Sequence, residues 1–346
     1  MHRFLFLLFT LWLTAAAAAA SEMSTGDKHR LVKQLRVELR ERYVLIDKIP
    51  EIEAALTEFA ASSAFAALTT RTAVAERLTE VLRRSDHHLG VQWLAAPEAQ
   101  RPRAGMSWFD RLDRQNSGFR RIEWLDGNIG YVEFWGFDEI NERSTARVAE
   151  AMAVVAETDA LIFDLRRNGG GSGEMVALIS SYLLPGGVHL NSFYWRATDT
   201  TSKTHTREEI AGKRLLDVPV YVLTSAETFS AAEEFAYDLK HLGRATLVGE
   251  PTRGGANPWQ WFELGDGFRA GIPVATAVNP VTRSNWERVG VQPDVPSSRA
   301  AALETAHRLA LERLQQTASS ESRRSEIAQA LSALANSRRD DTRAPR

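Results

Sequence analysis

The stretch Val218–Lys240, VPVYVLTSAETFSAAEEFAYDLK, joins a predicted buried strand to a predicted amphipathic helix. Its first residues, Val218 to Leu223, are apolar, β-branched or aromatic, which is typical of a buried strand. After the polar turn Thr224–Thr228, apolar residues recur at intervals of three and four, so a helix is expected to begin near Ser230. Ser230 therefore stands where a strand turns into a helix N-terminus. The free N–H groups and the positive end of the helix dipole favour an alkoxide or an oxyanion there.

The same serine also fits a purely structural role. Ser230-Ala231-Ala232-Glu233 matches the S-x-x-E capping box, in which serine and glutamate satisfy each other's backbone amides. On this stretch alone the cap is the simpler interpretation. Evidence for a nucleophile has to come from other parts of the chain.

Composition narrows the class of protein. The chain has 346 residues, of which 44% are hydrophobic and 25% charged, as expected for one large or two smaller globular domains. Its net charge of −2 gives no sign of a nucleic-acid-binding surface. The absence of cysteine excludes disulfides, a lipidated anchor and a cysteine hydrolase. No zinc motif, Walker loop or dinucleotide-binding motif is found, so neither a metal nor a cofactor is expected.

The N-terminus has the pattern of a signal peptide. Arg3 precedes an apolar run from Phe4 to Leu13, and Ala18-Ala19-Ala20 offers a cleavage site before Ser21. The apolar run is too short to span a bilayer. We therefore expect a periplasmic or secreted protein with no stable membrane anchor after cleavage; an uncleaved anchor is the alternative.

The remaining pattern predicts an α/β protein in several segments. After the signal peptide at 1–20, the expected segments are a helical domain at 21–94, a linker at 95–118, a core at 119–298, a helix at 299–316 and a polar tail at 317–346. Strands and helices alternate in the core, which indicates a partly parallel sheet. Asp126-Gly127 between two strand patterns predicts a hairpin. The tail is expected to hold at most one loose helix and to end in disorder.

A glycine run follows another predicted buried strand. Asp164–Gly171 reads DLRRNGGG and precedes a helical pattern. Consecutive glycines let backbone N–H groups point into a cavity, which suits an oxyanion hole. A flexible turn that needs positive φ angles is the alternative.

A serine nucleophile needs a base, and histidine is the natural one. Most of the histidines lie among charged residues or in loops. His87 and His88 instead end the helical region and lead into a strand-like segment. A plain surface turn would explain this pair equally well if it stood alone.

Five motifs together resemble the tail-specific, or C-terminal processing, serine peptidase family. They match most closely the branch that contains interphotoreceptor retinoid-binding protein and the tricorn core protease. The motifs are D-x-H-L at 86–89, D-L-R-x-N-G-G-G at 164–171, T-F-S-A-A-E at 228–233, G-E-P-T-x-G-G-A at 249–256 and W-E-x-x-G-V-x-P-D at 286–294. The resemblance covers roughly residues 30–315. It implies a crotonase-like (ββα) core behind a small N-terminal helical domain.

The resemblance also implies a set of catalytic residues. Ser230 matches the nucleophile, His88 the general base, and Glu287 the acid that orients the imidazole. The backbone N–H groups of Gly170 and Ala231 match the oxyanion hole. Gly169 or Gly171 could replace Gly170 as the donor, because the three glycines cannot be phased from the sequence. A surface carboxylate beside Arg288 is the plain alternative for Glu287.

Three departures from the family pattern are informative. Members with a Ser–Lys dyad carry a lysine in the loop after G-E-P-T, as G-K-G. This chain has Arg253-Gly254-Gly255 there and no lysine, so His88 must act as the base. Only about forty residues separate His88 from Asn128, too few for the PDZ domain that many members insert there. Tricorn-like sites place a serine before the base, where this chain has His87.

The leading hypothesis is an exported serine peptidase that acts on a peptide or protein substrate through an acyl-enzyme. The alternatives are a non-catalytic ligand-binding protein on the same core and an esterase that uses the same site.

Overall fold

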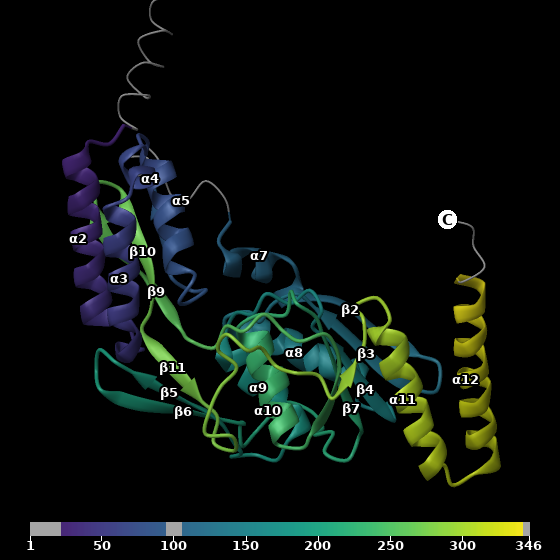
Figure 1. Cartoon of the computed structure of the whole chain (residues 1–346). Helices are drawn as coiled ribbons and strands as arrows, with labels where there is room; N and C mark the ends of the chain where they lie inside the picture. Colours follow the sequence, from purple (N-terminus) through teal and green to yellow (C-terminus); the bar gives the residue numbers. More distant parts are fainter. Residues whose placement is uncertain (1–21, 95–105, 342–346) are drawn as a thin grey trace, which may run out of the picture. The chain divides into compact units, whose positions relative to one another are not determined.

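The computed structural model describes residues 22–94 and 106–341, and the expected signal peptide at 1–20 lies outside them. The chain divides into two compact units (Figure 1). The first unit holds the described residues up to 94 together with Tyr194–Thr200 and Asn257–Thr276. The second unit holds Met106–Phe193, Thr201–Ala256 and the chain from Ala277 onwards.

Helices of the first unit pack on an antiparallel sheet. The helices are α2 (Thr25–Arg42), α3 (Ile49–Ala60), α4 (Ser63–Ala66) and α5 (Arg71–Leu82), with a short 3₁₀ turn at Ile46–Lys48. The strands are β1 (Gly90–Trp93), β10 (Phe268–Pro273) and β9 (Trp259–Gly265), in the order β1-β10-β9.

The first unit has one hydrophobic core, formed by its N-terminal helices and by strands that come much later in the chain. Phe268, Ala270 and Ile272 alternate along β10 and pack with the apolar faces of the helices. An amphipathic helix must bury its apolar stripe against another element, and here strands β9 and β10 provide the apolar surface. The expected helical domain at 21–94 therefore shares its core with strands from the segment that was assigned to 119–298.

A six-stranded mixed sheet forms the centre of the second unit. Its strands are β12 (Val295–Pro296), β8 (Ala245–Gly249), β7 (Val220–Thr224), β4 (Ala160–Asp164), β3 (Ile129–Phe134) and β2 (Phe119–Leu125), in that order. All neighbours are parallel except the hairpin β2–β3, whose turn contains Asp126 and Gly127. The predicted α/β class, the partly parallel sheet and the hairpin are confirmed.

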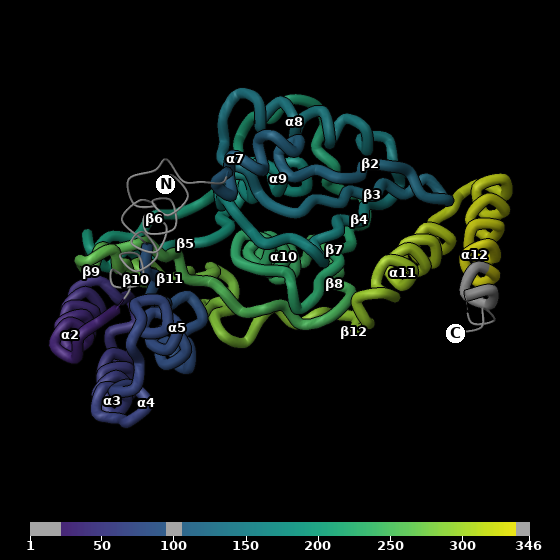
Figure 2. The backbone as a smooth tube through the Cα atoms, turned by 90° about the horizontal axis from the view of Figure 1, so that it is seen from above, coloured from purple at the N-terminus to yellow at the C-terminus, as the bar shows by residue number. Residues whose placement is uncertain are grey.

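Helices cover both faces of this sheet (Figure 2). One face packs on α8 (Glu142–Val154), α9 (Gly173–Leu183) and α10 (Ala231–His241), and the other packs on α11 (Ala302–Thr317). Helix α12 (Glu321–Asp341) packs alongside α11. Alternation along β4 explains the two cores, because Leu161 and Phe163 face the first set and Ala160 and Ile162 the second.

Two parts of the chain hold elements that were not expected. The linker segment contains α7 (Trp108–Arg114), capped by Ser107 and Asp110, and a 3₁₀ turn at Asn116–Gly118. A third sheet, in the order β11-β5-β6, comes from β5 (His189–Trp195), β6 (Thr200–His205) and β11 (Ala275–Val278). Strand β6 is polar and mostly exposed, so it lacks the alternation that would have predicted it.

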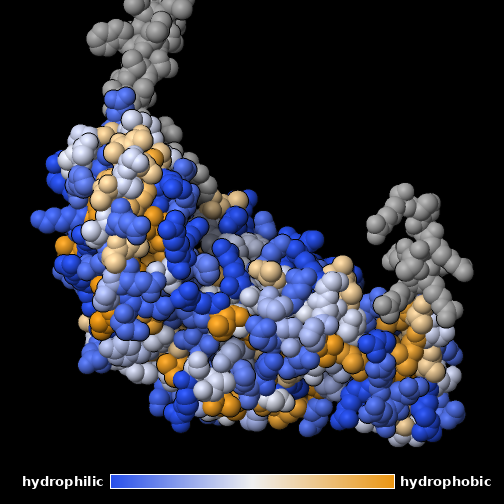
Figure 3. Space-filling model, viewed as in Figure 1, coloured by the Kyte–Doolittle hydropathy of each residue, from blue (hydrophilic) through white to orange (hydrophobic). Residues whose placement is uncertain are grey.

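The polar tail holds one helix, α12, which ends at Asp341, and the expectation allowed at most one helix there. Helix α12 forms there because Ile327 and Ala330, one turn apart, are buried in the core beneath α11. Hydrophilic residues cover most of the face drawn in Figure 3, with hydrophobic side chains in small groups. Among the described residues, no helix is long and apolar enough to cross a membrane.

Candidate active site

Ser230 occupies a strained position at the start of α10. Strand β7 ends at Thr224 and α10 begins at Ala231, so the predicted strand–turn–helix is confirmed. The carboxylate of Glu233 accepts a hydrogen bond from the Ser230 N–H at 2.8 Å, which is the glutamate half of the predicted capping box. The backbone of Ser230 has φ 57° and ψ −123°, however, whereas N-cap residues are normally extended. Such a conformation costs about 1–3 kcal/mol in a non-glycine residue and is concentrated at functional sites. Capping alone does not account for it.

The glycine loop lies directly against this serine. The Phe229 N–H donates to the carbonyl oxygen of Asn168 at 3.0 Å, which joins the two loops. Gly170 has φ 89°, and a Cβ atom there would lie 2.7 Å from the Ser230 Cβ and 3.0 Å from the Ala231 nitrogen. Only glycine allows this approach, so the loop presents bare backbone to the serine.

The N–H groups of the loop differ in their partners. Gly169 donates to the carbonyl oxygen of Trp135 at 3.0 Å, and Gly170 donates to Asn168 Oδ1 at 2.9 Å. Within the described residues, no acceptor is found for the N–H of Gly171 or of Ala231. These two N–H groups are therefore open to a ligand in this structure.

Glu233 does more than cap its helix. The same carboxylate accepts hydrogen bonds from Thr252 Oγ1 at 2.5 Å, Gly254 N at 2.6 Å and Gly255 N at 2.8 Å. Burial raises the pKa of Glu233, although these hydrogen bonds stabilise the ionised form and oppose the shift. The loop that follows β8 is thereby fastened to the start of the nucleophile helix.

Glu287 is fixed to the same loop. Its Oε2 accepts a hydrogen bond from the Ala256 N–H at 2.8 Å. The neighbouring Trp286 is 1% exposed, and its indole N–H donates to the carbonyl oxygen of Gly255 at 3.0 Å. Glu287 and Ser230 are thus positioned through one hydrogen-bonded network within the second unit.

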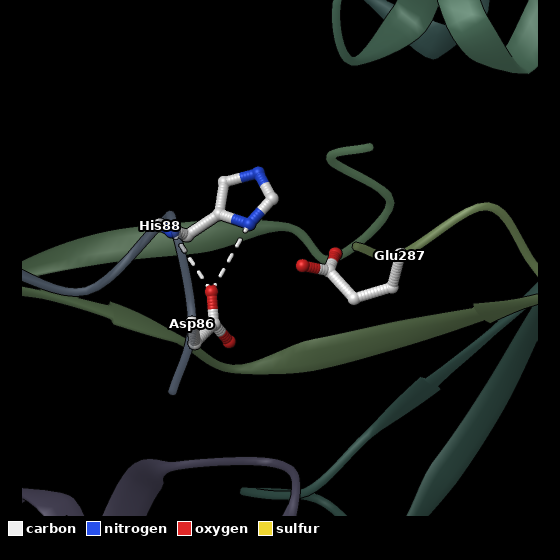
Figure 4. Close-up of side chains that lie close together, drawn as sticks. All are labelled: Asp86, His88 and Glu287. Atoms are coloured by element: carbon white, nitrogen blue, oxygen red, sulfur yellow. Dashed lines mark hydrogen bonds and ion pairs between the residues drawn. The ribbon is translucent and has the colours of Figure 1, made fainter. Parts of the chain in front are cut away.

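His88 belongs to the first unit, where Asp86 orients it (Figure 4). Asp86 Oδ1 accepts a hydrogen bond from the His88 backbone N–H at 2.8 Å and lies 3.5 Å from its Nδ1. The Tyr43 hydroxyl donates to Asp86 Oδ2 at 2.9 Å. Burial opposes ionisation of Asp86, but hydrogen bonds from His88, its charge and the Tyr43 hydroxyl together lower the pKa of this carboxyl.

Asp86 is a site residue that the sequence did not reveal. It was visible only as a letter of the D-x-H-L motif, two positions before His88. Its partner Tyr43 lies 43 residues away in the chain, so no local sequence pattern predicts the hydrogen bond between them. Within either unit, the described residues form no cluster of three metal-ligating side chains.

A buried acid pair lies on the nucleophile helix. Glu234 and Asp238 are one turn apart on α10 and are 5% and 0% exposed. Asp238 Oδ1 accepts hydrogen bonds from the amides of Asn191 at 2.9 Å and Asn279 at 3.0 Å. Burial raises the pKa of Glu234 to about 7, and burial together with the charge of Glu234 raises that of Asp238. The pair therefore holds a proton in the folded protein over a range where both acids would be ionised in the unfolded chain.

This pair should make the protein less stable as pH rises. Because the folded pKa of Glu234 is raised above the unfolded value, the contribution of Glu234 to stability is fully present below about pH 4.5 and is lost as the pH rises to about 7. Glu234→Gln should remove most of this fall, which is on the order of 3 kcal/mol. Urea unfolding at pH 5 and pH 8 measures it, with Glu150→Gln on the surface of α8 as the matched control. Equal pH dependence in wild type and Glu234→Gln would contradict the assignment.

Comparison with known proteins finds a family whose model matches the segment that contains most of the site residues. Residues 128–297 match the model of peptidase family S41. The match includes Ser230, the glycine loop and Glu287, and does not extend to His88.

The alignments with similar proteins span only part of this chain and only part of each relative. The chloroplastic carboxyl-terminal-processing peptidase 2 of Arabidopsis thaliana is 32% identical over 170 residues, which are 49% of this chain and 32% of the relative. The carboxyl-terminal-processing protease of Picosynechococcus sp. is 27% identical over 194 residues, 54% of this chain and 41% of the relative. The chain thus spans less than half the length of either relative.

Two solved structures share the fold over most of the chain. A putative peptidase from Parabacteroides merdae has a TM-score of 0.62 at 19% identity, covering 86% of this chain and 100% of that one. A lipoprotein from Streptococcus agalactiae has a TM-score of 0.55 at 16% identity, covering 83% and 96%.

Proposed function

We propose that this chain, a member of peptidase family S41, is a serine peptidase that hydrolyses peptide bonds through an acyl-enzyme on Ser230. The observation that carries the proposal is the strained backbone of Ser230, at φ 57° and ψ −123°, on a helix N-terminus with Gly170 packed against it. A strained turn between strand and helix exposes a nucleophile and sets open N–H groups beside it. The proposal includes a crotonase-like core in the second unit.

In the proposed reaction the Ser230 hydroxyl attacks the peptide carbonyl while His88 accepts its proton. The tetrahedral intermediate places its oxyanion on the Ala231 N–H and on an N–H of the glycine loop. Gly171 can supply the second donor as it stands, whereas Gly170 would have to share the hydrogen that it gives to Asn168. His88 then protonates the leaving amine. Water, deprotonated by His88, releases the acyl group from Ser230.

Two other functions use the same core. A non-catalytic ligand-binding protein would gain nothing from a strained serine held against a glycine loop. An esterase would use the same groups on a weaker bond. Labelling with a fluorophosphonate probe, followed by peptide mapping, tests catalysis directly, and we expect the label on Ser230. Assay of matched peptide and ester substrates then separates a peptidase from an esterase. A folded protein without label on Ser230 would favour the binding protein.

Two carboxylates compete for the role of orienting His88. Glu287 has the support of the family resemblance, and Asp86 has the support of its contacts with His88 within the first unit. If Glu287 is the third member, Glu287→Gln should lower kcat by up to ~10⁴, as the triad aspartate does. Asp86→Asn should then cost less. The reverse order would assign the role to Asp86, and wild-type rates in both variants would leave only a Ser–His pair. Circular dichroism and thermal unfolding of both variants separate lost catalysis from lost folding.

Export is part of the same proposal. It rests on the signal-peptide pattern of residues 1–20. N-terminal sequencing of the native protein should begin near Ser21, and an intact Met1 would contradict it.

A further inference from the structure

We propose that Arg253 binds a carboxylate of the peptide substrate beside the nucleophile. The inference rests on the proposed peptidase function and specifies its substrate: a peptide with a negative charge close to the scissile bond. Arg253 lies in the loop after G-E-P-T, in which other members of the resembling family carry the dyad lysine between two glycines. Arg253 cannot act as a base itself, because a guanidinium stays protonated. The role proposed for it is electrostatic.

The backbone of Arg253 is attached to the turn that carries the nucleophile. Its N–H donates to the carbonyl oxygen of Thr228 at 3.1 Å. Its guanidinium carbon lies 4.7 Å from the ring centroid of Phe229, the residue directly before Ser230. Both contacts lie within the second unit. They attach Arg253 to Thr228 and Phe229, the two residues that come directly before the nucleophile in the chain.

The loop that carries Arg253 is held on both sides. Glu233 binds Thr252 and Gly254, the residues immediately before and after the arginine. Gly254 has φ 89°, and a Cβ atom there would lie 2.8 Å from the carbonyl carbon of Arg288. The Arg288 N–H also donates to the Gly254 carbonyl oxygen at 3.0 Å. The backbone on both sides of Arg253 is thus held in place, so the arginine is not part of a free loop.

The charge of Arg253 is available to a ligand. The residue is exposed, and no ion pair with a carboxylate is found for it in the described part of the chain. The arginines of the adjoining segments are different, since Arg166 pairs with Asp164 and Arg299 with Glu227. The cation–π contact with Phe229 does not use up the guanidinium N–H groups, which can still donate hydrogen bonds.

A carboxylate is the group that best fits this edge. The planar fork of the guanidinium matches two carboxylate oxygens, and such charge-assisted pairs are stronger than neutral hydrogen bonds. Two parts of a peptide can provide the group: the free C-terminal carboxylate, or the side chain of an aspartate or glutamate near the cleaved bond. The chemistry is shared, and substrate design distinguishes the sources.

The test uses matched fluorogenic peptides. One pair differs only in a free or amidated C-terminus, and a second amidated pair differs only in glutamate or glutamine next to the cleaved bond. The wild type should prefer one carboxylate form by about five- to twentyfold in kcat/KM, a ratio typical of a partly exposed charged hydrogen bond. Arg253→Gln should bring that ratio close to one. Arg147→Gln, on the surface of α8, is the matched control and should keep the preference.

Binding gives a second, independent readout. Affinities of the same peptides for Ser230→Ala should show the same preference, and Ser230→Ala/Arg253→Gln should lose it. This measurement needs no turnover, so it tests the inference even if the wild type hydrolyses none of the peptides. Absent hydrolysis together with an unlabelled Ser230 would refute the peptidase, whereas a carboxylate preference that survives Arg253→Gln would refute the role of Arg253. Equal affinity for all four peptides, or no binding, would also refute it.

Discussion

Ser230→Ala and Ser230→Asp should both fold and both be inactive. Loss of the nucleophile should lower kcat by about 10⁵- to 10⁶-fold, because the remaining groups of such a site add little once the attacking oxygen is gone. Peptide hydrolysis and fluorophosphonate labelling measure the loss. Both replacements keep a Cβ atom at φ 57°, so neither changes the backbone strain on which the proposal rests.

The capping role of Ser230 predicts the opposite result. Aspartate caps a helix as well as serine does and suits the helix dipole, so a pure cap would tolerate Ser230→Asp. In a catalytic site the new carboxylate would instead occupy the space of the oxyanion. Ser107 offers a matched control, because it caps α7 in a complete capping box with Asp110. Ser107→Ala should cost about 0.5–2 kcal/mol of stability without loss of hydrolysis. Measurable hydrolysis by folded Ser230→Asp would overturn the proposed mechanism.

The parts of the fold that the sequence predicts are those with a local pattern. The strand before Ser230, its helix and the Asp126-Gly127 hairpin are each specified by residues that are neighbours in the chain. A buried parallel strand such as β4 also has a recognisable apolar composition. The glycine run was recognisable for a similar reason, although its exact contacts with Ser230 depend on how the two loops meet.

The parts that the sequence misses depend on distant partners. Helix α12 is polar overall, and it is kept in place by Ile327 and Ala330 in a core shared with the central sheet. Glu233 fits a cap on local evidence, yet its hydrogen bonds to Thr252, Gly254 and Gly255 bind a loop about twenty residues away. Asp86 is likewise explained only by Tyr43. Each of these roles comes from a contact whose second member no local pattern identifies.

The second large effect should come from the base. His88→Ala should lower kcat by about 10⁵- to 10⁶-fold, since serine is a weak nucleophile until an adjacent base removes its proton. Asp86 accepts a hydrogen bond from the backbone N–H of His88, and the same carboxylate lies near Nδ1 of the imidazole. The other ring nitrogen, Nε2, is therefore the one that can take part in proton transfer. His87 is the matched control, because it is the exposed neighbour in the same turn. His87→Ala should therefore lose far less activity.

A double variant gives a stricter test of the assignment of His88 as the base for Ser230. If Ser230 and His88 act in one proton-transfer step, Ser230→Ala/His88→Ala should be no slower than either single variant, because the second change removes a group that has already lost its function. Two residues with unrelated roles would instead show losses that multiply. The comparison needs kcat values above the uncatalysed background and unfolding curves that show all three variants folded. Multiplied losses, or full activity in His88→Ala, would remove His88 from the mechanism and would require another base for Ser230.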